Sequence, residues 1–162
     1  MWRLIFLLTT LLLASCATGP GFSVPEANRD IQPGQVSTQP ELANQARVVW
    51  GGVIASSKNL SDETRLEIIA YPLARSSQRP KTEGATNGRF IIVQKGYLEP
   101  LDYAKGRKIT VKGVVQGTEM GQIGEAKYRY AILSPEEIYL WPVQSERQGI
   151  PIRFGIGFVF HN

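Results

Sequence analysis

The chain has 162 residues, of which 43% are apolar and 20% charged, a composition typical of one globular domain and not of a disordered polypeptide. The formal net charge of +4 is too small an excess to indicate a nucleic-acid partner. The sequence has one cysteine, which excludes an intramolecular disulfide.

The first 15 residues are typical of a signal peptide. A short positive start ending at Arg3 precedes an apolar run over 4–13, too short to span a bilayer, which takes about 20 residues. The sequence Leu13-Ala14-Ser15-Cys16 follows and resembles the lipobox of bacterial lipoproteins. It predicts cleavage between Ser15 and Cys16 and a covalent lipid, palmitate included, on Cys16. The alternative is an ordinary secretory signal followed by a coincidental cysteine.

Residue 17 bears on which membrane holds the lipid. Two or more acyl chains anchor a protein stably, whereas one binds only marginally. Ala17 stands where an Asp resembles an inner-membrane retention signal in Gram-negative bacteria. We therefore expect a lipid-anchored protein of the outer membrane that faces the periplasm.

Residues 16–46 are predicted to form the lipidated start and a flexible tether. The segment is rich in Pro, Gly, Gln, Asn, Ser and Thr and shows no sustained apolar period. As a coil, about 30 residues reach roughly 30 Å. The alternative is that Ile31 and Val36 dock part of the segment on the folded domain.

Alternating apolar and polar residues predict an all-β domain over 47–145. The six expected strands are 48–56, 64–73, 89–94, 108–117, 127–133 and 136–141. Six short strands with glycine-marked bends favour a small barrel or a sandwich.

The segments between these strands refine that expectation. The pair Gly51-Gly52 suggests a bulge or bend within the first strand. Residues 75–87 are expected to form a long loop, and 117–124 a hairpin loop. A short helical turn over 99–104 falls between the third and fourth strands, where an OB-fold has its helix. This position favours a small OB-like β-barrel, although the sequence leaves a sandwich open.

Residues 146–162 form an apolar C-terminal tail. Phe154, Ile156, Phe158 and Phe160 alternate, so the tail is expected to add one more strand. The alternative is insertion into a membrane surface or pairing with a partner's sheet edge.

The residues offer little for catalysis or metal binding. The only histidine, His161, lies next to the chain end, and Cys16 is expected to carry lipid. Asp102, Glu125, Glu136 and Glu137 are expected to be solvated rather than a catalytic carboxylate pair. We therefore predict no catalytic residues, no metal and no cofactor besides the lipid on Cys16.

Five aromatic residues are the candidate binding residues. They are Trp50, Tyr128, Tyr130, Tyr139 and Trp141. OB-folds bind oligosaccharides or single strands on such a face, and an envelope protein meets glycans rather than nucleic acid. The alternative is that these rings fill the core or cover the strands.

Several short segments resemble one known family. They are 49–54 (VWGGVI), 66–73 (LEIIAYPL), 88–90 (GRF), 102–107 (DYAKGR), 111–114 (VKGV) and 135–141 (PEEIYLW). In this order they resemble the Slp family, the starvation-inducible outer membrane lipoproteins. The resemblance implies an outer-membrane lipoprotein with an OB-like barrel and no catalytic residues. The departure from the family pattern lies in the C-terminal sequence over 151–160.

These observations predict a non-enzymatic structural or interaction module of the cell envelope, anchored in the outer membrane, with a glycan or protein partner and no nucleic-acid partner. The alternative is a ligand-binding module that takes envelope glycans or lipids on the aromatic face. A third hypothesis, an envelope hydrolase using His161 and the carboxylates, has the least support from the residues.

Overall fold

The computed structural model describes residues 19–43 and 45–143. The expected signal peptide over 1–15, the lipidation site Cys16 and the whole C-terminal tail over 146–162, including His161, lie outside the described residues. The described chain consists of five strands preceded by three short helical segments.

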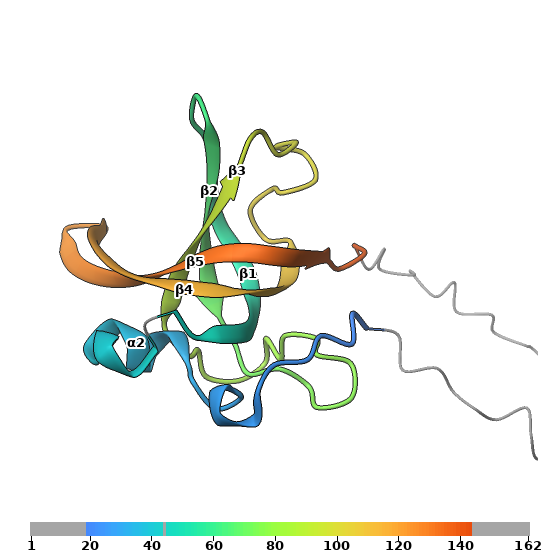
Figure 1. Ribbon diagram of the computed structural model, residues 1–162. Helices are drawn as coiled ribbons and strands as arrows, with labels where there is room; N and C mark the ends of the chain where they lie inside the picture. Colours follow the sequence, from blue (N-terminus) through green and yellow to red (C-terminus); the bar gives the residue numbers. More distant parts are fainter. Residues whose placement is uncertain (1–18, 44, 144–162) are drawn as a thin grey trace, which may run out of the picture.

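Five strands close into one barrel (Figure 1). They are β1 (Arg47–Asn59), β2 (Glu63–Ala70), β3 (Arg89–Lys95), β4 (Lys108–Ile123) and β5 (Ala126–Leu140). The order around the barrel is β1-β2-β3-β5-β4, and every pair is antiparallel except β3–β5, which is parallel. The prediction of an all-β, OB-like barrel is confirmed, and the sandwich alternative is wrong because the sheet closes on itself.

The glycine pair in β1 lies where that strand passes from one neighbour to the other. Residues 47–53 pair with β4 and residues 52–59 with β2, so Gly52 stands opposite both Ala70 and Ile109. A Cβ on Gly52 would overlap the carbonyl oxygen of Ile69. The irregularity in β1 lies between Ile54 and Ser56 rather than at the glycine pair, where the spacing between two strands leaves room only for a residue without a side chain.

Strands β4 and β5 form one long hairpin, which differs from the prediction. Residues 117–124 are strand up to Ile123, not a hairpin loop, and the two last expected strands are the single strand β5. Pro135 suggested a break, but it lies opposite Gly113 at a register irregularity, where a missing N–H is tolerated. The hairpin therefore extends well beyond the barrel wall (Figure 1).

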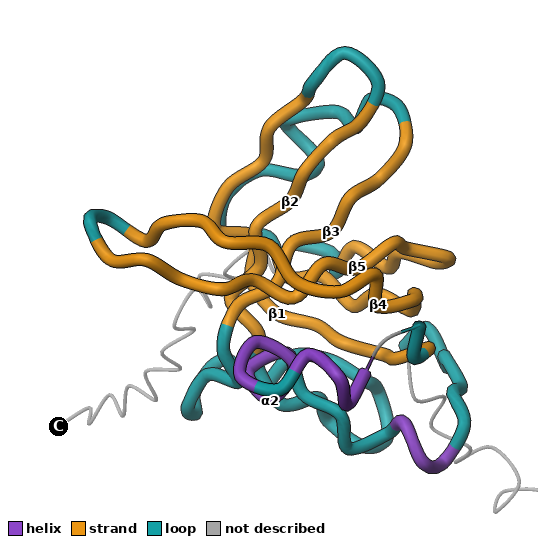
Figure 2. Tube along the Cα trace, turned by 60° about the vertical axis from the view of Figure 1, so that its left-hand side comes forward, coloured by secondary structure: helices purple, strands orange, loops and turns teal. Residues whose placement is uncertain are grey.

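The described part of the expected tether is folded, so the prediction of a flexible spacer is wrong from residue 19 onward. It forms η2 (Glu26–Asn28), α2 (Pro33–Thr38) and η3 (Pro40–Ala43). Figure 2 shows α2 against one end of the barrel, and Val36 is fully buried there. The docking alternative is the arrangement observed, because the open barrel end offers apolar surface that a few apolar side chains can cover.

Local chemistry also holds this segment in place. Pro33 occupies the first turn of α2, and the side chains of Gln32 and Gln35 form a reciprocal capping box. The indole Nε1 of Trp50 donates to the carbonyl oxygen of Ile31 at 2.7 Å. The segment is thus part of the domain rather than a spacer before it.

The core consists of the inward-facing residues of all five strands together with the N-terminal segment. Its largest fully buried members are Phe90, Ile54, Leu66, Ile68, Ile92, Ile109, Leu133, Val36, Val48, Val111 and Val115. In the segment that follows β3, Leu98 and Tyr103 pack against this cluster. The amide of Tyr103 donates to the Glu99 carbonyl at 3.0 Å, which confirms a single helical turn there. The segment over 75–87 is a loop, as predicted.

Candidate functional site

A groove lies where the β4–β5 hairpin leans over the outer face of β1, β2 and β3. Its volume is about 290 Å³. Its lining residues are Ser56, Lys58, Leu60, Arg65, Glu67, Ile91, Gln122 and Tyr130. We call this the hairpin groove, and it is the candidate functional site because OB barrels bind chain-like ligands on this face between the same loops.

Strand alternation explains why polar groups line the hairpin groove. In β2, Thr64, Leu66 and Ile68 are buried inside the barrel, so Arg65 and Glu67 project outward. The Arg65 Nη2 atom lies 2.7 Å from the Glu119 Oε2 atom of β4. This ion pair joins the wall of the barrel to the hairpin above it.

Glu67 is the centre of the polar network in the groove. Its Oε1 atom accepts from Arg89 Nη1 at 2.6 Å and lies 3.1 Å from the Tyr130 hydroxyl, and its Oε2 atom accepts from Ser56 Oγ at 3.3 Å. Burial, followed by the hydrogen bond to the Glu67 carboxylate, raises the pKa of Tyr130 to about 12. Tyr130 therefore keeps its proton at neutral pH and donates it.

The five predicted aromatic residues do not form one face. Trp50 is 3% exposed and packs edge-on against Phe90 in the core, with ring centroids 5.2 Å apart. The other four form two edge-on pairs: Tyr128–Tyr130 at 4.8 Å and Tyr139–Trp141 at 4.7 Å. Only the first pair reaches the hairpin groove, through Tyr130.

Most of these rings are also covered. Tyr130 and Trp141 are each 4% exposed, and the Tyr128 hydroxyl accepts the amide of Arg89 at 2.9 Å. The prediction of a shared ring surface is therefore wrong, and the alternative that the rings fill the structure is closer. Each ring has a large apolar area, and removing that area from water favours a position inside the structure over one on its surface.

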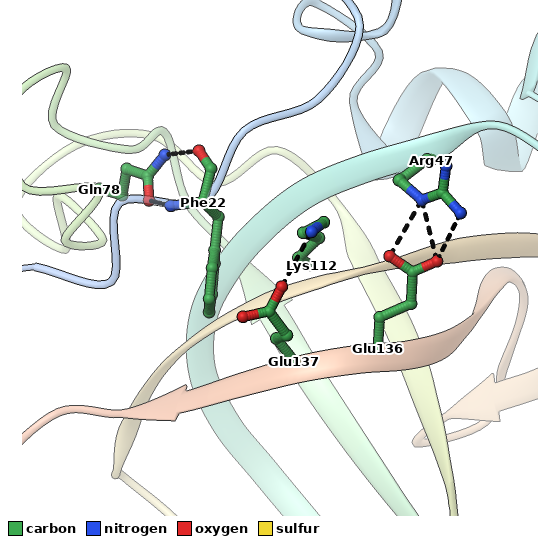
Figure 3. Close-up of polar contacts among 6 residues, drawn as sticks. All are labelled: Phe22, Arg47, Gln78, Lys112, Glu136 and Glu137. Atoms are coloured by element: carbon green, nitrogen blue, oxygen red, sulfur yellow. Dashed lines mark hydrogen bonds and ion pairs between the residues drawn. The ribbon is translucent and has the colours of Figure 1, made fainter.

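The carboxylates considered for a catalytic pair are used differently. Glu136 and Glu137 lie in ion pairs with Arg47 and Lys112 across the barrel wall, at 2.8 Å each (Figure 3). The hydrogen bond from Arg47 lowers the pKa of Glu136. Within 19–43 and 45–143, no group of three or more His, Cys, Asp or Glu residues is placed to hold a metal ion.

The residues that sequence reasoning missed are the charged ones of the groove. Arg65 and Glu67 were visible as the polar positions of an alternating strand, but nothing local indicated that Arg89, Glu119 and Tyr130 would meet them. These contacts join residues 22 to 63 positions apart. The sequence therefore indicated only which residues of β2 point away from the core.

The fold defines a class, the small closed barrels of OB-like topology. Residues 13–156 match the outer membrane lipoprotein Slp family, and the chain belongs to that family. The predicted family resemblance is confirmed. In the described part of the chain, no helix has the length and apolar character needed to cross a bilayer.

Curated relatives agree with the family. An uncharacterized protein of Haemophilus influenzae is 32% identical over 68% of this chain, and the match spans 60% of that protein's length. The uncharacterized lipoprotein YeaY and the outer membrane protein Slp, both of Escherichia coli, are each 30% identical, over 81% and 85% of this chain and 67% and 73% of their own.

Solved structures give distant matches. A small single-stranded DNA-binding protein of Streptomyces coelicolor has a TM-score of 0.35 and 17% identity, covering 60% of this chain and 94% of its own. Schizosaccharomyces pombe Pot1pC, bound to single-stranded DNA, has a TM-score of 0.31 and 12% identity, covering 79% and 90%. Likeness at this level has no bearing on what this chain binds.

Proposed function

We propose that the chain is a non-enzymatic interaction module, held in the outer membrane by lipid on Cys16 and facing the periplasm, which binds an uncharged envelope glycan in the hairpin groove. The observation that carries the proposal is the groove itself. It is a concave surface with both polar and apolar lining residues, between a barrel wall and a hairpin that Arg65 and Glu119 hold in place at 2.7 Å.

The charges of the groove favour a neutral ligand. Among the lining residues, Lys58 and Arg65 contribute +2 and Glu67 contributes −1. The ion-pair partners Glu63, Glu119 and Arg89 bring the local sum to zero. A polyanion such as nucleic acid gains affinity from unpaired cations, whereas Arg65 and Arg89 are each paired with a glutamate here. Hydroxyl and amide groups remain at Ser56 and Gln122, and these suit the hydroxyls of a sugar chain.

The same network supports binding rather than catalysis. Glu67 receives hydrogen bonds from the Arg89 guanidinium, the Tyr130 hydroxyl and Ser56, so its carboxylate oxygens are already occupied by fixed partners. Tyr130, with its pKa raised to about 12, stays protonated over the whole physiological range. These groups are arranged to hold a shape, which is what a recognition surface needs.

The anchor is tested on the exported protein. Intact mass analysis is expected to find a mature N-terminus at Cys16 carrying acyl chains, and metabolic palmitate labelling is expected to vanish in Cys16→Ala. Cys16→Ser, which keeps the size of the side chain, serves as a matched control and is also expected to lose the label. A mature N-terminus at another residue, or one without lipid, would refute the anchor.

The groove is tested on the mature lipoprotein in detergent micelles. Soluble peptidoglycan glycan fragments are titrated and the heat of binding is measured. Arg65→Gln loses a charged hydrogen-bond donor, so we expect about tenfold weaker binding. The matched control Arg47→Gln breaks an ion pair on another part of the wall and is expected to bind as the wild type does. No heat with the wild-type protein, or equal affinity for both variants, would contradict glycan binding in this groove.

A further inference from the structure

A second pocket lies at the end of β5, away from the hairpin groove. Its volume is about 160 Å³, and three cations line it: Arg79, Arg107 and Lys108. Trp141 and Val143 supply its apolar part. No carboxylate lines it among the described residues, so its local charge is +3.

These cations differ from those of the barrel wall. Arg47, Arg65, Arg89 and Lys112 each lie in an ion pair with a glutamate. Within 19–43 and 45–143, no ion pair uses a cation of the second pocket. A site lined by three half-buried cations in this way has an electrostatic potential that favours an anion.

The geometry of the arginines is fixed by their neighbours. The guanidinium of Arg79 stacks over the Trp141 ring, 5.0 Å from its centroid. Arg107 Nη2 donates to the Trp141 carbonyl at 3.2 Å, while its Nε is buried and has no hydrogen-bond partner within the part of the chain that the structure describes. A buried N–H without a partner is costly, and an anion's oxygen would satisfy it.

The pocket lies close to the point where the described chain begins. Gln78 exchanges two hydrogen bonds with the backbone of Phe22, at 2.8 Å and 2.6 Å (Figure 3). The Gln78 carbonyl accepts from Thr110 Oγ1 at 2.8 Å, and Thr110 Oγ1 accepts from the Trp141 indole at 2.9 Å. A continuous chain of contacts therefore connects the N-terminal segment with the floor of the pocket.

Figure 1 shows the same arrangement, since the blue beginning and the orange-red end of the described chain lie on one side of the molecule. Only two residues separate Cys16 from Gly19, and the three residue steps from one to the other span at most about 10 Å. A lipid on Cys16 would thus hold this side of the barrel near the headgroups of the membrane.

We infer that the pocket formed by Arg79, Arg107, Lys108 and Trp141 binds the phosphate of an anionic phospholipid headgroup in the membrane that holds the lipid anchor. The inference rests on the proposed anchor at Cys16. An acyl chain and a cationic patch together give the two attachments that stable membrane association takes.

The test uses the mature lipidated protein in vesicles of phosphatidylcholine, with or without phosphatidylglycerol. Hydrogen exchange is measured for the segments 106–108 and 141–143. We expect exchange to slow at least fivefold when phosphatidylglycerol is present, and we expect high ionic strength to remove the difference between the two kinds of vesicle. The double variant Arg107→Gln/Lys108→Gln is expected to exchange equally in both vesicles.

Two controls separate the possible failures. The variant Lys127→Gln/Arg129→Gln removes two exposed cations near the hairpin tip and is expected to keep the wild-type response. Exchange in the core strand β2 reports whether each variant is folded, and Lys108→Gln alone is the milder substitution if the double variant is not. Equal exchange of the wild type in both vesicles would overturn the headgroup site.

The anchor and the pocket also fail in different ways. Wild-type protein that does not sediment with either vesicle would disprove the anchor. Protein that sediments but shows no phosphatidylglycerol effect would disprove the pocket alone. Inorganic phosphate added to the micellar protein is expected to leave exchange unchanged, and slowing equal to that in phosphatidylglycerol vesicles would reassign the pocket to free phosphate.

Discussion

Val36 provides the sharpest test of whether the N-terminal segment is part of the folded domain. Its side chain is fully buried against the barrel end. Val36→Ala removes two carbons, worth about 0.8 kcal/mol each in transfer free energy, and leaves a small cavity, so we expect a loss of about 2–3 kcal/mol in the free energy of unfolding. For a domain of this size, that loss lowers Tm by about 10 °C.

The assay is urea denaturation of the mature protein in micelles, followed by tryptophan fluorescence. The matched control is Val143→Ala, the same chemical change at a side chain that is 69% exposed, with an expected effect below about 0.5 kcal/mol. A flexible tether would make the two variants indistinguishable. Equal midpoints for both would therefore refute the reasoning that α2 closes the barrel.

Three further predictions concern the barrel. Gly52→Ala is expected to cost about 3 kcal/mol in urea denaturation because its Cβ overlaps a β2 carbonyl. Gly84→Ala, whose Cβ would lie at an ordinary 4.0 Å from the Lys81 carbonyl oxygen, is expected to stay within about 0.5 kcal/mol, and similar costs for the two variants would contradict this. Arg47→Gln is expected to return the lowered pKa of Glu136 toward its ordinary value in an NMR titration and to lower the stability slightly. That loss is present at neutral pH and fades as the pH falls through the folded-state pKa of Glu136; an unchanged pKa would refute the pairing. Tyr130 is expected to ionise at about pH 12 in an ultraviolet titration. Its contribution to stability is therefore complete below pH 10 and is lost as the pH rises toward 12. Ionisation of Tyr130 near pH 10 would disprove its burial.

Strand content followed from the sequence because each strand has one buried and one outer face. In β2, the alternation of Leu66 and Ile68 with Arg65 and Glu67 set both the strand and its orientation. A special role for Gly51 and Gly52 was also predictable, since glycines inside a strand pattern often mark close approach of another backbone, although the irregularity itself lies at Ile54 and Ser56. The hairpin was harder, because Pro135 and a series of glycines resembled turn residues until their pairing partners were known.

The fold of the N-terminal segment could not be predicted for a different reason. Its apolar residues are few and do not repeat at a helical period, so the segment looks like a spacer by composition. Val36 and Ala43 are buried only because the barrel has an open end of matching size. Packing between distant parts of the chain decides such cases, and local propensity does not.

The hairpin groove was partly predictable. Parity correctly placed Tyr128 and Tyr130 on one face of β5, where their rings meet at 4.8 Å. Parity does not say whether that face points to solvent or is covered by another strand. Here Glu67 and the hairpin cover it, so Tyr130 supports the groove rather than offering a ring for stacking.

The folded N-terminal segment changes how the proposed anchor would orient the barrel. A tether of about 30 residues would let the domain turn freely, whereas the two residues between Cys16 and Gly19 leave a reach of about 10 Å. In Figure 1 the β4–β5 turn lies on the side opposite to both ends of the described chain. With lipid on Cys16, the cationic pocket would meet the headgroups while the hairpin groove opens away from the bilayer. The two proposed sites would then act at once, one on the membrane and one on a glycan beyond it, because neither covers the other.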